Sequence, residues 1–430
     1  MQAGRFRFLP ECERTVSSHQ ILRCRVCGAE TPAAPIHVCE DCFGPLELVY
    51  DAESLSGLTR ERIAERPPTL WRYRELLPLE GDPRIGLAVG FTPLVPAPRL
   101  GDELGIDDLW IKNDAVNHPT LSFKDRVVAV AINRAIEFGL DAVGCASTGN
   151  LANSVAAQAA AAGLPAWIFI PEGIEREKII ASSIYHPNLV RVRGVYDDVN
   201  RLCAEVADRF NWGIVNVNLR PFYGEGSKTV AFEVVEQLGW RAPANIVAPM
   251  AGGALVTKIR KGLLELERTG LASDTSRTRV FGGQAAGCAP IVEALWRGET
   301  WVRPVRPNTI ALSLAIGNPA DGPFAIAAMR ESGGWGEAVT DEAIVDGIRL
   351  LAETEGIFAE TAGGVTVAAA RRLAATGRLA TTGPTVLCIT GNGLKTPGAV
   401  AGTLDAGTLI EPRLSAVTAL VEAGLQPAAV

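Results

Sequence analysis

The sequence has no excess of positive charge, no secretory pattern and no long apolar run. Its 41 Lys and Arg are outnumbered by 48 Asp and Glu, which gives a net charge of −7. Nucleic-acid binding relies on clustered basic side chains, so we expect no nucleic-acid partner. Residues 1–20 carry several charges without an apolar core, which argues against a secretory signal. The Ala-rich stretch after Gly149 is broken by Asn153, Gln158 and Pro165, so we expect no membrane span. These absences favour a cytoplasmic protein.

Two nucleotide-binding motifs and a disulfide framework are also missing. No Gly-x-x-x-x-Gly-Lys-Ser/Thr occurs, and no Gly-x-Gly-x-x-Gly opens a helix. The nine cysteines are an odd number in a chain without secretory features, which argues against paired disulfides. Apolar residues make up 47% of the 430-residue chain, which is enough for a large core and two or three domains.

Four of the cysteines form two matching knuckles in a short ribbon at residues 21–50. They are Cys24, Cys27, Cys39 and Cys42. Two Cys-x-x-Cys pairs suit tetrahedral ligation of zinc by four thiolates, which leaves no open position for water. We therefore expect a structural zinc that supports folding. Four unligated thiols or a redox pair are the alternatives, and His37, between the pairs, is a candidate replacement ligand.

From about residue 107 onward, strand-like and helix-like segments alternate. Apolar, β-branched runs that suit strands occupy residues 109–112, 143–146, 167–170, 189–192, 214–217, 246–249, 280–283 and 386–390. Helical patterns occupy residues 124–137, 151–162, 175–185, 197–210, 227–238 and 255–266. Residues 305–335 interrupt the alternation. Strands that are apolar on both faces and alternate with helices predict an α/β fold with parallel sheets. Eight to ten strands favour two α/β domains.

Three of the turns that follow predicted strands are rich in small or hydroxyl-bearing residues. They are Ser147-Thr148-Gly149-Asn150, Ala251-Gly252-Gly253-Ala254 and Thr390-Gly391-Asn392-Gly393. In open α/β sheets, ligands bind at the carboxyl ends of the strands. Free backbone N–H groups at a helix start, with no side chain in the way, can hold a phosphate. The alternative for each turn is an ordinary strand-to-helix connection.

A lysine, Lys124, begins one of the predicted helices within Ser122-Phe123-Lys124-Asp125-Arg126. The helix dipole opposes a positive charge at this end, which favours a neutral, nucleophilic amine suited to a Schiff base. The alternative is a solvated lysine in the first turn. The residues by themselves indicate an anion site beside an amine, and hence a covalent cofactor or a phosphorylated ligand.

The segments around these residues resemble the threonine synthase family of fold-type II pyridoxal-phosphate enzymes. The resemblance covers roughly residues 20 to 400. It is carried by residues 117–126, 145–150, 225–229, 317–319, 355–358 and 390–395. It implies a two-domain open parallel-sheet fold of the tryptophan synthase β-like type. The implied parts are an N-terminal extension (1–65) with the zinc-ribbon-like segment, a large cofactor-binding domain (66–123 and 215–412), a small domain (124–214) and a tail (413–430).

The resemblance also implies roles for individual residues. Lys124 would bind pyridoxal phosphate covalently and shuttle protons, Asn150 would contact its phenolic oxygen, and Thr390 would face its ring nitrogen. The cofactor phosphate would lie on Ala251, Gly252, Gly253, Ala254 and Leu255. Ser147 and Thr148 would take the substrate carboxylate, and the substrate phosphate would contact Arg220, Asn216 and Lys228. Glu360-Thr-Ala-Gly-Gly-Val-Thr366 departs from the family's Pro-Ala-Ser-Ala type segment, so substrate preference could differ.

The implied reaction converts O-phospho-L-homoserine and water to L-threonine and phosphate, in a protein expected to be a homodimer. Two other activities of the superfamily remain open: sulfur β-replacement on phosphoserine, and serine or threonine dehydration. From a different class, the chain could be a zinc-ribbon binding protein on an inactive scaffold. The presence of Lys124, Asn150 and Thr390 together argues against that alternative.

Overall fold

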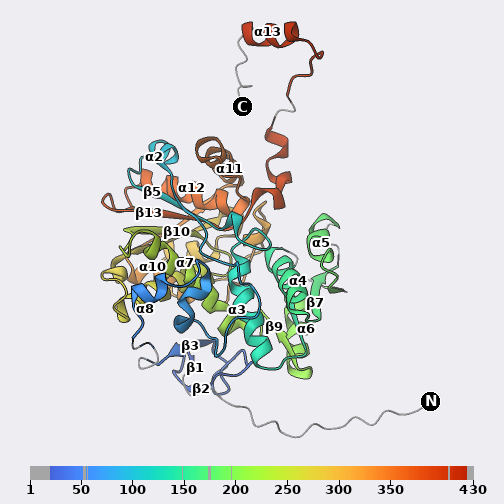
Figure 1. Ribbon diagram of the computed structural model, residues 1–430, viewed down its shortest axis with the longest axis vertical. Helices are drawn as coiled ribbons and strands as arrows, with labels where there is room; N and C mark the ends of the chain where they lie inside the picture. Colours follow the sequence, from blue (N-terminus) through green and yellow to red (C-terminus); the bar gives the residue numbers. More distant parts are fainter. Residues whose placement is uncertain are drawn as a thin grey trace, which may run out of the picture.

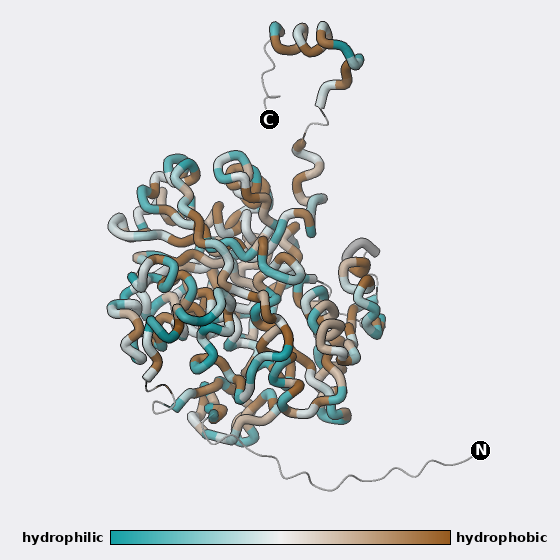
Figure 2. The backbone as a smooth tube through the Cα atoms, viewed as in Figure 1, coloured by the Kyte–Doolittle hydropathy of each residue, from teal (hydrophilic) through white to brown (hydrophobic). Residues whose placement is uncertain are grey.

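The structure is a computed structural model that describes residues 20–423 except 52–54, 56, 148, 173–175, 195, 405 and 406. It contains three sheets, and the two larger ones form the body of the molecule (Figure 1). Figure 2 shows apolar segments running through the interior of this body. Within the described part of the chain, no helix combines the length and apolarity needed to cross a membrane.

The largest sheet has six strands in the order β12-β11-β10-β13-β5-β4. Their bounds are β4 Leu94–Pro96, β5 Leu109–Asn113, β10 Asn245–Pro249, β11 Arg279–Ala285, β12 Gly336–Val339 and β13 Thr385–Ile389. All neighbours are parallel except β4, which runs antiparallel to β5 at the edge. Strands β10 and β13 are buried along their whole length, as expected for a parallel sheet covered on both faces.

Helices cover both faces of this sheet. On one face lie α2 (Pro98–Leu104), α11 (Asp341–Glu355) and α12 (Thr361–Ala375). On the other lie α8 (Ala254–Arg268), α9 (Pro290–Trp296) and α10 (Gly322–Glu331), with α7 (Arg220–Gln237) packed on α8. Neighbouring strand residues divide between the two faces: Ile246 packs in one core and Val247 in the other. The expected α/β fold is confirmed.

The second sheet has four parallel strands in the order β8-β7-β6-β9. They are β6 Ala142–Ala146, β7 Ala166–Pro171, β8 Asn188–Val192 and β9 Trp212–Ile214. Helices α3 (Lys124–Glu137) and α4 (Asn150–Ala162) pack on one side and α6 (Tyr196–Arg209) on the other, with α5 (Arg176–Ser183) beside α4. All four strands lie within the predicted small domain, whose boundaries stay a prediction.

Several predicted bounds were wrong. The strand predicted at 214–217 ends at Ile214, because the Asn218 side chain accepts from the Ile214 N–H at 2.8 Å and donates to the Trp212 carbonyl at 2.9 Å. Helix α7 begins at Arg220, seven residues before the predicted start at 227, with Pro221 in its first turn. Residues 305–335 contain helix α10, and the short strands β4 and β12 were not predicted.

The third sheet is the ribbon, in the antiparallel order β2-β1-β3. Its strands are β1 Gln20–Cys24, β2 Glu30–Pro32 and β3 Leu46–Tyr50. The ribbon packs on the body at α7, at the bottom of Figure 1. Helix α1 (Arg60–Ala64) and a 3-10 helix (Leu70–Leu76) connect it to the large sheet. At the other end of the chain, α13 (Leu414–Glu422) projects away from the body.

Candidate active site

The three predicted turns lie at the carboxyl ends of β6, β10 and β13. Thr390 follows β13 and Ala251 lies just beyond β10, and these two strands are neighbours in the large sheet. Ser147 follows β6 of the smaller sheet. Carboxyl ends of neighbouring parallel strands share one edge, which is where ligands bind in this kind of sheet.

Lys124 is the first residue of α3, and the chain just before it is fastened to the end of β13. The Phe123 N–H donates to the Thr390 carbonyl at 2.8 Å, and Ser122 forms an antiparallel bridge with Gly391. The partly buried Lys124 ammonium donates to the Tyr223 hydroxyl on α7 at 2.9 Å. The structure thus brings the predicted nucleophile next to the predicted ring-nitrogen partner.

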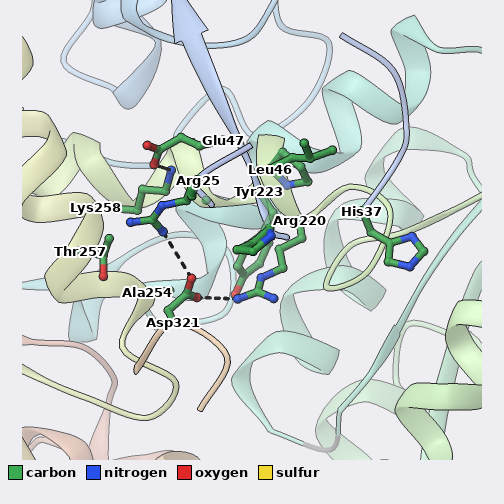
Figure 3. A pocket seen from close by; sticks show the side chains of 13 residues that line it. Arg25, His37, Leu46, Glu47, Arg220, Tyr223, Ala254, Thr257, Lys258 and Asp321 are labelled. Carbon is green, nitrogen blue, oxygen red and sulfur yellow. Dashed lines mark hydrogen bonds and ion pairs between the residues drawn. The ribbon is translucent and has the colours of Figure 1, made fainter. Parts of the chain in front are cut away.

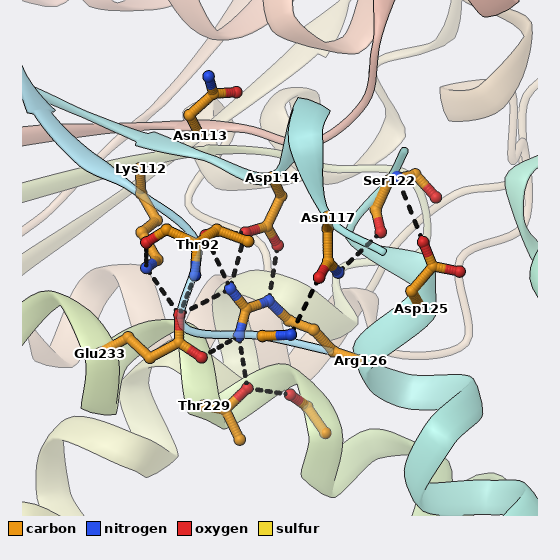
Figure 4. A network of polar contacts seen from close by, with 12 residues as sticks. Thr92, Lys112, Asn113, Asp114, Asn117, Ser122, Asp125, Arg126, Thr229 and Glu233 are labelled. Carbon is orange, nitrogen blue, oxygen red and sulfur yellow. Dashed lines mark hydrogen bonds and ion pairs between the residues drawn. The ribbon is translucent and has the colours of Figure 1, made fainter. Parts of the chain in front are cut away.

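A fully buried arginine, Arg126, anchors the first turn of α3 (Figure 4). Its guanidinium contacts both oxygens of Asp114 at 2.7 Å and also pairs with Glu233 of α7. Lys112 on β5 shares Glu233 at 2.6 Å. Burial raises the pKa of Glu233, but the charges of Arg126 and Lys112 outweigh it and lower the pKa to about 2. This network holds the start of α3, and with it Lys124, against β5 and α7.

Asn150, the first residue of α4, donates from its amide nitrogen to both oxygens of Glu360, at 3.0 and 2.9 Å. Glu360 is 3% exposed, and its own N–H donates to the Gly391 carbonyl beside Thr390. Burial raises the pKa of Glu360, and the Asn150 hydrogen bond offsets this only in part. Glu360 therefore joins the Asn150 turn of the small sheet to the Thr390 turn of the large one.

The turn after β10 has the shape of a phosphate cradle at the start of α8. Gly253 has φ +91°, and a Cβ there would lie 2.9 Å from Ala325 and 3.1 Å from the Asp321 carbonyl, so only glycine fits. A Cβ at Gly252 would meet only the Ile316 side chain, at 3.9 Å, which is an ordinary van der Waals contact. No side chain caps the first N–H groups of α8. Free N–H groups beside an open glycine turn suit an anion.

The predicted substrate residues do not all lie together. Ser147 accepts from the Gly149 N–H at 3.3 Å, at the start of α4. Asn216 lies beside it, accepting from the Ala146 N–H at 3.2 Å. Thr148 lies outside the described residues. Arg220, the first residue of α7, pairs with Asp321 at 2.7 Å, close to the cradle.

Lys228 lies apart from Ser147, Asn216 and Arg220. Its position does not support the predicted contact with a substrate phosphate. Its side chain has no exposed surface, and its ammonium is paired with Glu225 at 2.6 Å and Glu265 at 2.8 Å. It also lies over the ring of Tyr50 from the ribbon, 4.0 Å from the centroid. Helical spacing explains the difference: Lys228 lies on a face of α7 that meets α8 and the ribbon.

The structure brings the four knuckle cysteines together. Their sulfurs all lie within 4.8 Å of one another, with Cys24 and Cys42 at 3.4 Å and Cys27 and Cys39 at 3.7 Å. The backbone hydrogen bond from Cys27 lowers the pKa of Cys24 to about 6, whereas the pKa values of Cys27 and Cys42 are raised, so one of the four sulfurs is favoured as a thiolate before a metal binds. His37 is outside this cluster and lines a nearby pocket instead.

The residues present fit pyridoxal phosphate. Lys124 supplies an amine, Gly253 lies in a turn that a Cβ would fill, and the turns that carry Asn150 and Thr390 are joined through Glu360. Two residues of this site, Tyr223 and Glu360, were not predicted. Tyr223 lies four residues before the helix predicted at 227–238, where a lone aromatic residue gives no sequence signal for a site, whereas Glu360 heads the segment that departs from the family pattern.

The chain resembles known proteins over most of its length. Residues 85–391 match the family model described as pyridoxal-phosphate dependent enzyme. Threonine synthase of Methanocaldococcus jannaschii is 38% identical over 88% of this chain and 93% of its own length. Threonine synthase of Methanosarcina acetivorans is 35% identical over 92% of this chain and 97% of its own length.

Solved structures share the fold at lower identity. Maize serine racemase superposes with a TM-score of 0.61 at 20% identity, covering 80% of this chain and 96% of its own. Threonine deaminase isoform 2 of Solanum lycopersicum superposes with a TM-score of 0.59 at 20% identity, covering 73% of this chain and 89% of its own. These neighbours are enzymes of the tryptophan synthase β-like fold. With this fold, with Lys124 at the start of α3 and a glycine cradle after β10, and with relatives at 35–38% identity along most of the chain, the protein belongs to the threonine synthase family of pyridoxal-phosphate-dependent enzymes.

Proposed function

We propose that this protein is a threonine synthase that converts O-phospho-L-homoserine and water to L-threonine and phosphate. The observation that carries the proposal is the placement of Arg220 beside the glycine cradle, within the site that contains Lys124. A cationic side chain at this position suits a substrate that carries a second phosphate in addition to that of the cofactor.

Lys124 and Asn150 would hold the cofactor, Thr390 would face its ring nitrogen, and residues 251–255 would bind its phosphate. Pyridoxal phosphate, when bound, supplies an electron sink that makes protons at the Cα and Cβ of an amino acid easier to remove. The Lys124 amine, at the start of α3, can accept and return these protons, and its contact with Tyr223 orients it.

The substrate's two anionic ends fit two different helix starts. The hydroxyl of Ser147 and the N–H groups at the start of α4 suit the α-carboxylate. Arg220 at the start of α7 suits the leaving phosphate, because a guanidinium can donate two parallel hydrogen bonds to it. Asn216 lies beside Ser147, where it supports the same wall of the site.

A steady-state comparison of phosphate release from O-phospho-L-homoserine and from O-phospho-L-serine with a sulfur nucleophile tests the proposal. Dehydratase activity is tested with L-serine and with L-threonine as substrates, by measuring the keto acid that forms. We expect the highest kcat/KM with O-phospho-L-homoserine and threonine as the product. Faster turnover of any of the other three substrates would assign the chain to another activity of the superfamily.

The cysteine cluster is proposed to hold a structural zinc ion. Support comes from four sulfurs within bonding reach of a single point. Two further proposals, a cytoplasmic location and a homodimer, rest on the composition and on the family resemblance.

A further inference from the structure

One ribbon side chain reaches from the cysteine cluster toward the active site. Arg25 lies between Cys24 and Cys27 in the first knuckle, and its N–H donates to the Pro45 carbonyl at 3.0 Å in the second. Its guanidinium lies over the ring of Phe324 on α10, 3.5 Å from the centroid. It forms an ion pair with Asp321 at 3.6 Å. The cluster therefore fixes the backbone from which Arg25 extends.

Asp321 connects this arginine to the proposed substrate site. One of its carboxylate oxygens faces Arg25, and the other accepts from Arg220 at 2.7 Å (Figure 3). Its backbone N–H donates to the Gly252 carbonyl of the cradle at 3.2 Å. Asp321 is thus part of the cradle's own support while it holds the guanidinium of Arg220.

The ribbon is held firmly enough on the body to keep this contact in place. Glu47 of β3 pairs with Lys258 of α8 at 2.7 Å, and Lys258 also pairs with Glu225 of α7 at 2.8 Å. The Tyr50 hydroxyl donates to the same Glu225 at 3.0 Å. Glu225 is fully buried, Lys258 nearly so and Glu47 partly buried, and opposite charges in such surroundings interact more strongly than in water. The ribbon is therefore a fixed part of the wall around α7 and α8.

We propose that Arg25 is a positioning residue for the substrate phosphate: it acts through Asp321 on Arg220, so that the cysteine cluster tunes phosphate affinity. The inference rests on the proposed function in one respect, the contact between Arg220 and a phosphate.

The charge balance gives the physical reason. Arg25, Asp321 and Arg220 together carry a net charge of +1, so Arg220 keeps an attraction for an incoming dianion while Asp321 orients it. Without Arg25, Asp321 would be balanced by Arg220 alone, the net charge would be zero, and the guanidinium would be drawn toward the carboxylate. The loss would appear in phosphate binding rather than in proton transfer at Lys124.

The experiment compares the cofactor-loaded wild type with Arg25→Ala, Arg25→Lys and Phe324→Ala. The matched control is Arg23→Ala, because Arg23 lies two residues away on an exposed face and pairs with Glu30. For Arg25→Ala we expect the KM for O-phospho-L-homoserine and the Ki of inorganic phosphate to rise about fivefold, with kcat within about twofold. Arg25→Lys should restore part of the affinity.

Phe324→Ala leaves the knuckles unchanged, and it keeps the test valid if Arg25→Ala fails to retain zinc or to fold. It removes the ring under the guanidinium, so KM and Ki should rise in the same direction by about twofold. Zinc and cofactor content, measured on each variant, should match the wild type.

Arg220→Ala distinguishes a failure of the positioning role of Arg25 from a failure of the proposed contact between Arg220 and phosphate. If Arg220→Ala raises the Ki of phosphate while Arg25→Ala and Phe324→Ala behave like Arg23→Ala, the positioning role is wrong and the proposed function stands. If Arg220→Ala leaves the Ki unchanged, the proposed phosphate contact is wrong and the inference falls with it.

Discussion

The amide nitrogen of Asn150 lies within 3.0 Å of both carboxylate oxygens of Glu360. The two residues are 210 positions apart and lie at the starts of α4 and α12, which pack on different sheets. Because a carboxylate only accepts hydrogen bonds, this contact fixes which end of the Asn150 amide faces it. Glu360 therefore sets the orientation of the Asn150 amide, which is the side chain proposed to contact the cofactor's phenolic oxygen.

Replacing Glu360 with Gln should therefore disturb the cofactor. The new side chain has nearly the same size, but its amide can present a donor to Asn150 instead of an acceptor. We expect the visible absorbance band of the lysine-bound cofactor to shift and kcat/KM to fall by about tenfold, as for other supporting hydrogen bonds. Glu355→Gln, in α11 and paired with the Leu100 N–H, is the control. Equal spectra for the two variants would contradict the orienting role of Glu360.

Lys124→Ala and Lys124→Arg should both abolish the visible cofactor band, since neither side chain can form the covalent link. The arginine variant keeps the positive charge, so loss of the band in this variant shows that the covalent link is needed and not the charge alone. Borohydride reduction of the wild type, followed by peptide mass spectrometry, should place the label on Lys124. Recovery of the label on Lys395, a partly buried lysine whose ammonium donates to the Thr120 carbonyl, would overturn the assignment.

Tyr223→Phe should lower kcat by about tenfold. This is less than the loss expected for a group that itself transfers the proton, because Tyr223 only orients Lys124. The substitution removes only the hydroxyl that accepts from Lys124, so the cofactor should still bind with an unchanged absorbance intensity. Tyr73→Phe is the matched control. Tyr73 is fully buried, and its hydroxyl donates to Glu236 of α7, the helix that carries Tyr223. A normal kcat in Tyr223→Phe would mean that the contact has no part in proton transfer.

The stability of the fold should fall steeply in acid through Glu233. Its pKa is lowered from 4.5 to about 2 in the folded protein. A lowered pKa means that the stabilisation is present above about pH 4.5 and is lost as the pH falls toward 2. The contribution is on the order of 3 kcal/mol. Denaturant unfolding of the wild type and Glu233→Gln should give a large difference at pH 7 that shrinks below pH 4.5.

Glu353→Gln, at an exposed site on α11, should show no such pH dependence. A difference between wild type and Glu233→Gln that stays constant from pH 7 to pH 3 would show that Glu233 does not titrate in this way.

Purified protein should contain roughly one zinc per chain, and Cys39→Ser should remove it and lower the melting temperature. Loss of the metal frees four thiols in the ribbon that packs on α7, so the effect should extend to the body. Cys288→Ser, at a buried cysteine outside the cluster, is the control for a simple loss of sulfur. A full zinc content in Cys39→Ser would show that the cluster is not the metal site.

Local pattern was sufficient for much of the fold. Strands such as β10 and β13 are apolar at every position, because a parallel sheet is covered on both faces, and this pattern stands out in a sequence. Helix α3 was predicted with its observed bounds, 124–137. Short edge strands such as β4 escaped prediction because three residues are too few to show a period.

The sequence by itself determined the fold class, the cysteine knuckles and the turns after the strands. These depend on composition and on spacing between near neighbours. The tertiary structure alone decided which distant groups meet. Glu225 lies only three residues before Lys228, but nothing in the sequence shows that Glu265 of α8 pairs with Lys228 or that Tyr50 of the ribbon covers it. Likewise, only chain folding brings Glu360 to Asn150, because burial and pairing of charges depend on residues that are far apart in the chain.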